Sequence, residues 1–359
     1  MHDPSRLQSI WESPEGSGKV SYIDQTLLPH KRVVRRLKCF EDALEAIILM
    51  RVRGAPLIGV TAAFGMALAA QDCGSRFFDR RFKKHARQML QTRPTAVNLR
   101  AAVDYQLNAL TDIARPRQTR RVLLRSARQF MNQEIRYSER IGRFGAAVLK
   151  RLYRKKRKKL NILTHCNAGI LACVKWGTAT APIYRAAMEG VPLHVWVDET
   201  RPRNQGASLT AWEMKECGIE HTVIADNAGA HLMQRGEVDL VITGADRVTA
   251  NGDAANKIGT LLKAIAAREY KVPFWVAFPT TTIDRTIRDG VREIPIEERP
   301  QDEVTHIRGR SGKHILSVQL TPDKTRAANP AFDVTPGRLI TGYITEQGAV
   351  DASKFRAIH

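Results

Sequence analysis

A thiol and a carboxylate each follow an apolar run that has the length of a buried strand. Cys166 comes after the run 161–164, within the segment His-Cys-Asn-Ala-Gly, and Asp246 comes after the run 240–243. Short apolar runs that end in polar residues and glycine are typical of the strand-to-helix turns of a parallel sheet. A thiol and a carboxyl group on opposite loops could move protons on a small substrate. Both residues are therefore candidates for acid–base chemistry.

Each of these residues also has an ordinary explanation. A cysteine is more often a buried apolar side chain than a nucleophile, and Cys173 in particular fits a core position. Asp246 could pair with Arg247 or cap the next helix. The grouping of the candidates, more than any single one, favours a functional site.

Two basic segments in the first half have the composition of an anion-binding site. Arg53, Gly54 and Ala55 precede an apolar helix predicted over 60–70. Glycine lets the backbone approach a ligand, free amides at a helix start point outward, and the arginine fork suits phosphate. Arg93 opens a similar segment, in which a proline precedes another predicted helix. An ordinary loop with a solvated arginine explains the first segment equally well.

Polar residues in the second half add to this set. Gln205 lies in the polar segment 198–206, which follows the apolar run 193–197. Asn256 and Lys257 stand beside a predicted helix start, where Lys257 could hold a phosphate, although both could also belong to a plain helix surface. The sequence shows no Ser-His-Asp signature and no zinc-type spacing of cysteines. The residues by themselves indicate a phosphorylated small molecule and acid–base chemistry.

The elements that must position these residues differ between the two halves of the chain. Apolar runs predict strands in the second half over 161–164, 193–197, 222–225, 240–243 and 273–277. Helices are predicted between them, one of which follows Gly177 and runs to about Glu189. This alternation implies right-handed crossovers and a Rossmann-like parallel sheet, with ligands at the carboxyl ends of the strands. No G-x-G-x-x-G or P-loop motif is present, which argues against a dinucleotide or P-loop site.

The first half is predicted to be mainly helical. Its patterns indicate one strand, over 20–25, and helices over 40–50, 60–70 and 99–158. We therefore expect an α/β protein in which a mainly helical N-terminal domain with a small sheet, residues 1–150, is followed by a Rossmann-like catalytic domain, residues 151–359.

The composition is that of a folded protein with room for two domains. The chain has 359 residues, of which 43% are hydrophobic and 26% charged. No run reaches the roughly 18 apolar residues of a membrane helix, and the first residues lack the apolar core of an export signal. Five scattered cysteines favour free thiols in a reducing compartment. We expect a cytoplasmic protein without a membrane partner.

The net charge is unusually positive. The sequence has 57 basic and 36 acidic residues, a formal charge of +21, and its longest basic run covers 151–159. Such a field attracts anions, from phosphorylated metabolites to nucleic acid. A solvated helix end is the simpler explanation of the run. A nucleic-acid patch is the alternative, and the lack of a recognised binding motif nearby argues against it.

Six ordered motifs resemble those of methylthioribose-1-phosphate isomerases of methionine salvage. They are Arg53-Gly54-Ala55-Pro56, Arg93-Pro94-Thr95-Ala96-Val97-Asn98-Leu99, Thr164-His165-Cys166-Asn167-Ala168-Gly169, Asp198-Glu199-Thr200-Arg201-Pro202, Gly244-Ala245-Asp246-Arg247 and Asn256-Lys257-Ile258-Gly259. The resemblance extends from about Asp24 to Thr345. The same fold family includes ribose-1,5-bisphosphate isomerases and the regulatory subunits of the eukaryotic guanine-nucleotide exchange factor of translation initiation.

The resemblance implies a function and a set of site residues. It implies conversion of 5-methylthioribose 1-phosphate to 5-methylthioribulose 1-phosphate by a homodimeric enzyme without metal or cofactor. Its catalytic residues fall on Cys166 and Asp246. Its substrate-binding positions fall on Arg53, Gly54, Ala55, Arg93, Gln205, Asn256 and Lys257. The alternatives are an isomerase of 5-deoxyribose 1-phosphate or ribose 1,5-bisphosphate, and a non-catalytic regulatory subunit that senses a sugar phosphate or nucleotide.

Overall fold

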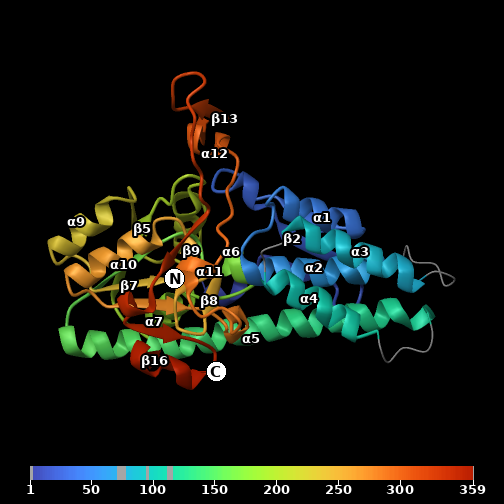
Figure 1. Ribbon diagram of the computed structural model, residues 1–359, viewed down its shortest axis with the longest axis horizontal. Coiled ribbons are helices and arrows are strands. Elements are labelled where there is room, and N and C mark those ends of the chain that lie inside the picture. The colour runs from blue at the N-terminus through green and yellow to red at the C-terminus, as the bar shows by residue number, and fades with distance from the viewer. Residues whose placement is uncertain (1–2, 71–77, 94–96, 111–115, 359) are drawn as a thin grey trace.

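The computed structural model describes residues 3–70, 78–93, 97–110 and 116–358 (Figure 1). The predicted helix start around Pro94 and part of the predicted helix 99–158 lie outside these residues. No described helix is both long and apolar enough to cross a membrane.

A buried helix, α2 (Ala55–Ala69), is the centre of the N-terminal region. Fourteen of its residues, Pro56 to Ala69, are buried, which explains why its sequence is apolar on all sides. Around it pack α1 (Phe40–Ile48), α3 (Phe78–Thr92), α4 (Val97–Asn108) and α5 (Pro116–Lys156). A three-stranded antiparallel sheet precedes them, formed by β1 (Ile10–Glu12), β2 (Val20–Ile23) and β3 (Val34–Leu37).

A seven-stranded sheet organises the second half of the chain. Its strands are β4 (Leu160–Thr164), β5 (Leu193–Asp198), β6 (His221–Ile224), β7 (Leu240–Thr243), β10 (Phe274–Ala277), β15 (Gly342–Ile344) and β16 (Ala349–Asp351). All neighbours are parallel except β15 and β16. From β6 the order is β6-β5-β4-β7-β10-β15, the 3-2-1-4-5-6 order of a Rossmann sheet. The chain therefore reverses direction across the sheet between β4 and β7.

Helices connect these strands, and one of them differs from the prediction. The connections are α6 (Ile170–Cys173), α7 (Thr180–Met188), the π-helical turn η4 (Gly206–Thr210), α8 (Ala211–Glu216), α9 (Ala228–Gln234) and α10 (Thr260–Glu269). The helix predicted after Gly177 coincides with α7, whereas the short helix α6 was not predicted. Val174 and Trp176 have φ of 71° and 66°, and Gly177 has φ of 92°, so the backbone leaves the helical region and divides the segment into α6 and α7.

A second, four-stranded sheet lies beside the parallel one. It contains β11 (Ile283–Asp284), β8 (Arg247–Thr249), β9 (Ala254–Lys257) and β14 (Phe332–Thr335) in that order. Asn256 and Lys257 thus end a buried strand, which excludes the plain helix surface considered above. After α11 (Gly290–Glu293) and α12 (Asp302–Thr305), the hairpin of β12 (His306–Ser311) and β13 (His314–Gln319) projects from the body of the molecule (Figure 1).

Short helical turns complete the architecture. They are η1 (Pro4–Arg6), η2 (Gln25–Leu27), η5 (Thr280–Thr282), η6 (Gly337–Leu339) and η7 (Ala352–Ile358). The fold is mixed α/β with a seven-stranded, mostly parallel sheet. Residue 150, where we expect the first domain to end, lies in the last turns of α5, and the division into domains 1–150 and 151–359 stays a prediction.

Candidate active site

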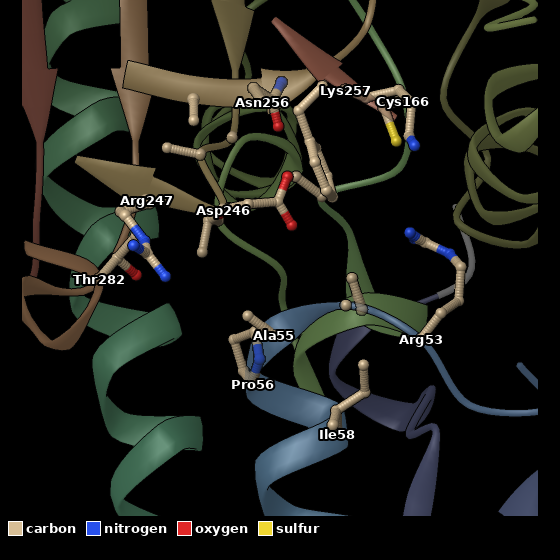
Figure 2. A pocket seen from close by; sticks show the side chains of 18 of the residues that line it. Arg53, Ala55, Pro56, Ile58, Cys166, Asp246, Arg247, Asn256, Lys257 and Thr282 are labelled. Carbon is tan, nitrogen blue, oxygen red and sulfur yellow. The ribbon is translucent and has the colours of Figure 1, made fainter. Parts of the chain in front are cut away.

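A cavity of about 130 Å³ opens at the point where the sheet order reverses, beyond the carboxyl ends of β4 and β7. This is the position at which open α/β sheets bind their ligands. Every predicted site residue lines it: Arg53, Gly54, Ala55, Arg93, Cys166, Gln205, Asp246, Asn256 and Lys257. Figure 2 shows Cys166, Asp246 and Lys257 from the sheet side, facing Arg53, Ala55 and Pro56 at the start of α2.

Cys166 is held in a backbone conformation that non-glycine residues rarely adopt. Its φ is 63°, and such strain persists where the surrounding structure imposes it. Its N–H donates to Thr200 Oγ1 at 2.8 Å, and its carbonyl accepts from Thr210 Oγ1 at 2.6 Å. Burial raises the pKa of the Cys166 thiol, while the charges of Arg53 and Lys257 act in the opposite direction. The buried thiol therefore keeps its proton more firmly than an exposed cysteine.

Asp246 faces the cavity directly after β7. Its N–H donates to Ala255 O at 2.9 Å, which joins the end of β7 to the second sheet. Burial raises the pKa of the Asp246 carboxyl, and Lys257, Arg53 and Arg93 partly oppose this shift. The carboxyl group thus keeps a proton to a higher pH than an ordinary aspartate, which is the condition for a general acid.

The N-terminus of α2 completes the opposite wall. Gly54 has φ of 89°, and a Cβ there would come within 2.5 Å of Ala172 Cβ, so a larger residue would displace α2 from α6. No side chain caps this N-terminus. Arg53 Nη2 donates to Asn167 O at 2.6 Å and to Asn167 Oδ1, whereas its buried Nε has no hydrogen-bond partner within the described structure. Uncapped amides and a guanidinium bound only to neutral oxygens form an anion site.

A buried glutamate that the sequence prediction missed fixes this wall to the sheet. Both carboxylate oxygens of Glu213 are used: they accept from the N–H groups of Ile170 and Leu171, each at 2.9 Å, from Tyr184 OH at 2.9 Å, and from Asn167 Nδ2 at 2.8 Å. Asn167 in turn holds Arg53. One glutamate in an amphipathic helix gives no sequence signal of such a role, because its partners are more than 25 residues away.

Further polar groups close the cavity from the second sheet. Lys257 Nζ donates to Ala331 O at 2.8 Å and lies 4.7 Å from the centre of the Phe332 ring. Burial lowers the pKa of Lys257, and Cys166 and Asp246 act against that shift. Asn256 Nδ2 donates to Thr260 Oγ1 at 3.0 Å. Ala331 and Phe332 thus lie against the Lys257 side chain.

The two remaining predicted residues reach the cavity from its rim. Arg93 Nη2 lies 3.3 Å from Glu297 Oε2 in a partly buried ion pair. Gln205 begins the turn η4, and its buried Oε1 has no hydrogen-bond partner within the described residues. An unsatisfied buried acceptor beside a cavity is a position for a ligand hydroxyl.

One group of side chains near the cavity has the composition of a metal site. His165, Asp198 and Asp226 lie close together within the described part of the chain. However, the His165 ring nitrogens contact Asp198 Oδ2 and Ile258 O, both at 2.8 Å. Lys263 Nζ lies 3.1 Å from the same Asp198 oxygen. Hydrogen bonds and an ion pair account for this group, so we assign no metal to it.

Comparison with known proteins identifies the family. The model of the Initiation factor 2 subunit family, IF-2B, matches residues 51–352. The chain belongs to this family. It is 52% identical over 352 residues to a methylthioribose-1-phosphate isomerase from Paramagnetospirillum magneticum, covering 96% of this chain and 94% of the relative.

Solved structures of the IF-2B family show the same fold. The 5-methylthioribose 1-phosphate isomerase of Pyrococcus horikoshii OT3 is 38% identical with a TM-score of 0.85, covering 99% of this chain and 95% of that one. The translation initiation factor eIF-2B subunit delta of A. fulgidus is 35% identical with a TM-score of 0.79, covering 97% of both chains. The resemblance to the isomerases that the motifs predicted is confirmed.

Proposed function

We propose that this IF-2B family member is an aldose–ketose isomerase that converts 5-methylthioribose 1-phosphate to 5-methylthioribulose 1-phosphate. One observation carries the proposal. Cys166 and Asp246, which follow the two strands that flank the reversal of the sheet order, face the same cavity as the Arg53 guanidinium and the uncapped N-terminus of α2. Full-length relatives about 50% identical to this chain are named for this reaction.

Asp246 is the general acid of the proposed mechanism. The C1 oxygen of the substrate is esterified, so the ring cannot open as a free hemiacetal. The bond between C1 and the ring oxygen must break while that oxygen takes a proton. The raised pKa of Asp246 supports its donating this proton near neutral pH. The products of this step are a C4 hydroxyl, an electron-deficient C1 that bears the phosphate, and the Asp246 carboxylate.

Hydrogen then moves from C2 to C1, and two routes account for every proton and electron pair in this step. In the first, the Cys166 thiolate takes the C2 proton to give an enol phosphate. The thiol so formed then protonates C1, while the C2 hydroxyl gives its proton to the Asp246 carboxylate and becomes the ketone. In the second, hydride passes directly from C2 to C1 while the C2 hydroxyl gives its proton to the Asp246 carboxylate. The raised pKa of Cys166 favours the second route, because a thiol that keeps its proton is a poor base. Deuterium placed at C2 distinguishes them: the hydride route retains all of it at C1, even in ordinary water.

The rest of the cavity accommodates the two ends of the substrate. Arg53, the N-terminus of α2 and Lys257 bind the phosphate in this proposal. Met50, Ile58, Val97, Ile294 and Phe332 provide apolar surface for the methylthio group. A pocket separates such tails by only about 1–3 kcal/mol, so 5-deoxyribose 1-phosphate is expected as a poorer second substrate. We further propose that the enzyme works as a homodimer in the cytoplasm.

Turnover of 5-methylthioribose 1-phosphate by the wild type, Cys166→Ser and Asp246→Asn tests the proposal. We expect the wild type to convert the substrate and both variants to lose orders of magnitude in kcat while still binding it. Cys173→Ser is the matched control, because Cys173 is a second buried thiol that lines the cavity from the end of α6. If the folded wild type binds the sugar phosphate without converting it, the chain is a sensor, as a likeness to a translation factor subunit would allow.

A further inference from the structure

The positive charge that the active site does not use is concentrated on α5. Seven of its exposed arginines lie on one side of the helix: Arg121, Arg125, Arg136, Arg140, Arg143, Arg151 and Arg154. At about 100° per residue, these positions fall within roughly a third of the helix circumference. We call them the α5 arginine face. It extends for about 50 Å at 1.5 Å per residue, and Figure 1 shows α5 along one side of the molecule, from the N-terminal helices to the parallel sheet.

Two observations show that this face is available for binding. Within the described part of the chain, none of the seven arginines forms an ion pair with a carboxylate. In addition, α5 contains two acidic residues, and only Glu139 is exposed, since Glu134 is buried. Three lysines of the basic run 151–159 differ from the arginines of this face: Lys156 and Lys158 contact Asp239, and Lys159 contacts Glu220. The nucleic-acid patch considered for that run is therefore better located along the whole of α5.

We propose that the α5 arginine face binds the phosphate backbone of double-helical nucleic acid. Arginine forks match phosphate oxygens, and a straight row about 50 Å long spans roughly one and a half turns of a duplex. No aromatic or large aliphatic side chain of α5 is among the exposed hydrophobic residues. Binding through stacked single-stranded bases would need such aromatics, so the face suits backbone contacts that are independent of sequence.

The same features argue against other occupants. A helix that lies on an anionic membrane needs an apolar face to insert, and the exposed side of α5 has none. A second copy of the chain across a twofold axis would place this positive face against itself, which like charges oppose. An acidic polypeptide would also satisfy the charge of this face. The experiment therefore includes one as a competitor.

Binding of the full-length protein to a labelled DNA duplex of about 24 base pairs, followed by fluorescence anisotropy, tests the proposal. If all seven arginines contact phosphates, the affinity falls several-thousand-fold between about 50 and 200 mM salt. In the triple variant Arg136→Gln, Arg140→Gln, Arg143→Gln, the same change in salt costs only on the order of a hundredfold. A triple arginine-to-lysine variant at these positions keeps the charge and is expected to keep the wild-type salt dependence.

The control variant removes the same charge from another surface. This triple variant, with Lys83→Gln, Lys84→Gln and Arg87→Gln, changes exposed positions of α3. That helix packs on α1, α2 and α4 rather than on α5. The variant is expected to bind the duplex like the wild type, and isomerase turnover of both triple variants verifies their folding. If both triple variants bound the duplex equally weakly, net charge alone would explain the binding, and the proposal would be overturned. Equal affinity for a single strand, efficient competition by polyglutamate, or no duplex binding at low salt would also overturn it.

Discussion

Arginine is used in two opposite ways in this molecule. Arg53 is buried, bonded only to neutral oxygens of Asn167, and its charge acts on the pKa of both Cys166 and Asp246. Arg140, on α5, is exposed and makes no ion pair within the described residues. Charges interact strongly where water is excluded, and exposed charges are screened within about 10 Å. A few buried charges therefore suffice in the cavity, whereas a surface must collect many to bind an anion.

Replacing the buried arginine is expected to have the largest effect. Arg53→Gln removes the guanidinium from the wall of the cavity and leaves its partner Asn167 in place. Hydrogen bonds to charged groups contribute about 1.5–3 kcal/mol, so kcat/KM is expected to fall roughly 10- to 150-fold. Steady-state kinetics on the sugar phosphate provide the measurement. An unchanged kcat/KM would remove Arg53 from the site.

The second prediction concerns the group that positions Arg53. Glu213→Gln replaces an acceptor oxygen by a donor that faces an N–H group, so a buried hydrogen bond is lost at a cost of about 1–3 kcal/mol. We expect a lower Tm and, because Asn167 sets the position of Arg53, a rise in KM larger than the fall in kcat. Glu216→Gln, an exposed position of the same helix, is the control. A lower Tm with an unchanged KM would limit Glu213 to a structural role.

A third prediction tests what burial does to charge on α5 itself. Burial, with a smaller contribution from Glu346, raises the pKa of Glu134 from 4.5 to about 8. The folded state therefore holds a proton that the unfolded state releases. The stability from this proton is complete below about pH 4.5 and is lost as the pH rises through about 8. Between pH 6 and pH 8 the free energy of unfolding should fall by about 2 kcal/mol from this group.

Denaturant unfolding at several pH values measures this change. In Glu134→Gln the decrease should disappear, because glutamine does not titrate. Glu139→Gln, on the exposed side of the same helix, is expected to keep the wild-type pH dependence. If Glu139→Gln also flattened the profile, burial would not be the cause.

The smallest effect is expected from the exposed arginine. Arg140→Gln is the same substitution as Arg53→Gln, on a side chain without an ion pair within the described residues. The free energy of unfolding should change by no more than about 0.5 kcal/mol, and kcat/KM should not change measurably. The pair of variants measures the difference between a buried and an exposed arginine. An effect of Arg140→Gln on turnover would connect α5 to the active site, contrary to our interpretation.

Local patterns in the sequence were sufficient to predict most strands of the parallel sheet. The apolar runs at 161–164, 193–197 and 240–243 coincide with β4, β5 and β7, because a strand buried on both faces needs continuous apolar residues. The short helix α6 was not predicted, since it ends where Val174 and Trp176 adopt positive φ in their tertiary surroundings. The hairpin of β12 and β13 was also missed, because its exposed strands lack a clear apolar face.

The sequence by itself determined the candidates for chemistry, because Cys166 and Asp246 directly follow apolar strands, and the order of the motifs indicated the family. Only the tertiary structure decided how these residues are held. The hydrogen bonds that Asn167 donates to Glu213 and that Arg53 donates to Asn167 join residues 46 and 114 positions apart. Hydrophobic periodicity reports whether a side chain is buried, but not which distant partner it meets, because strand order and helix packing set that partner.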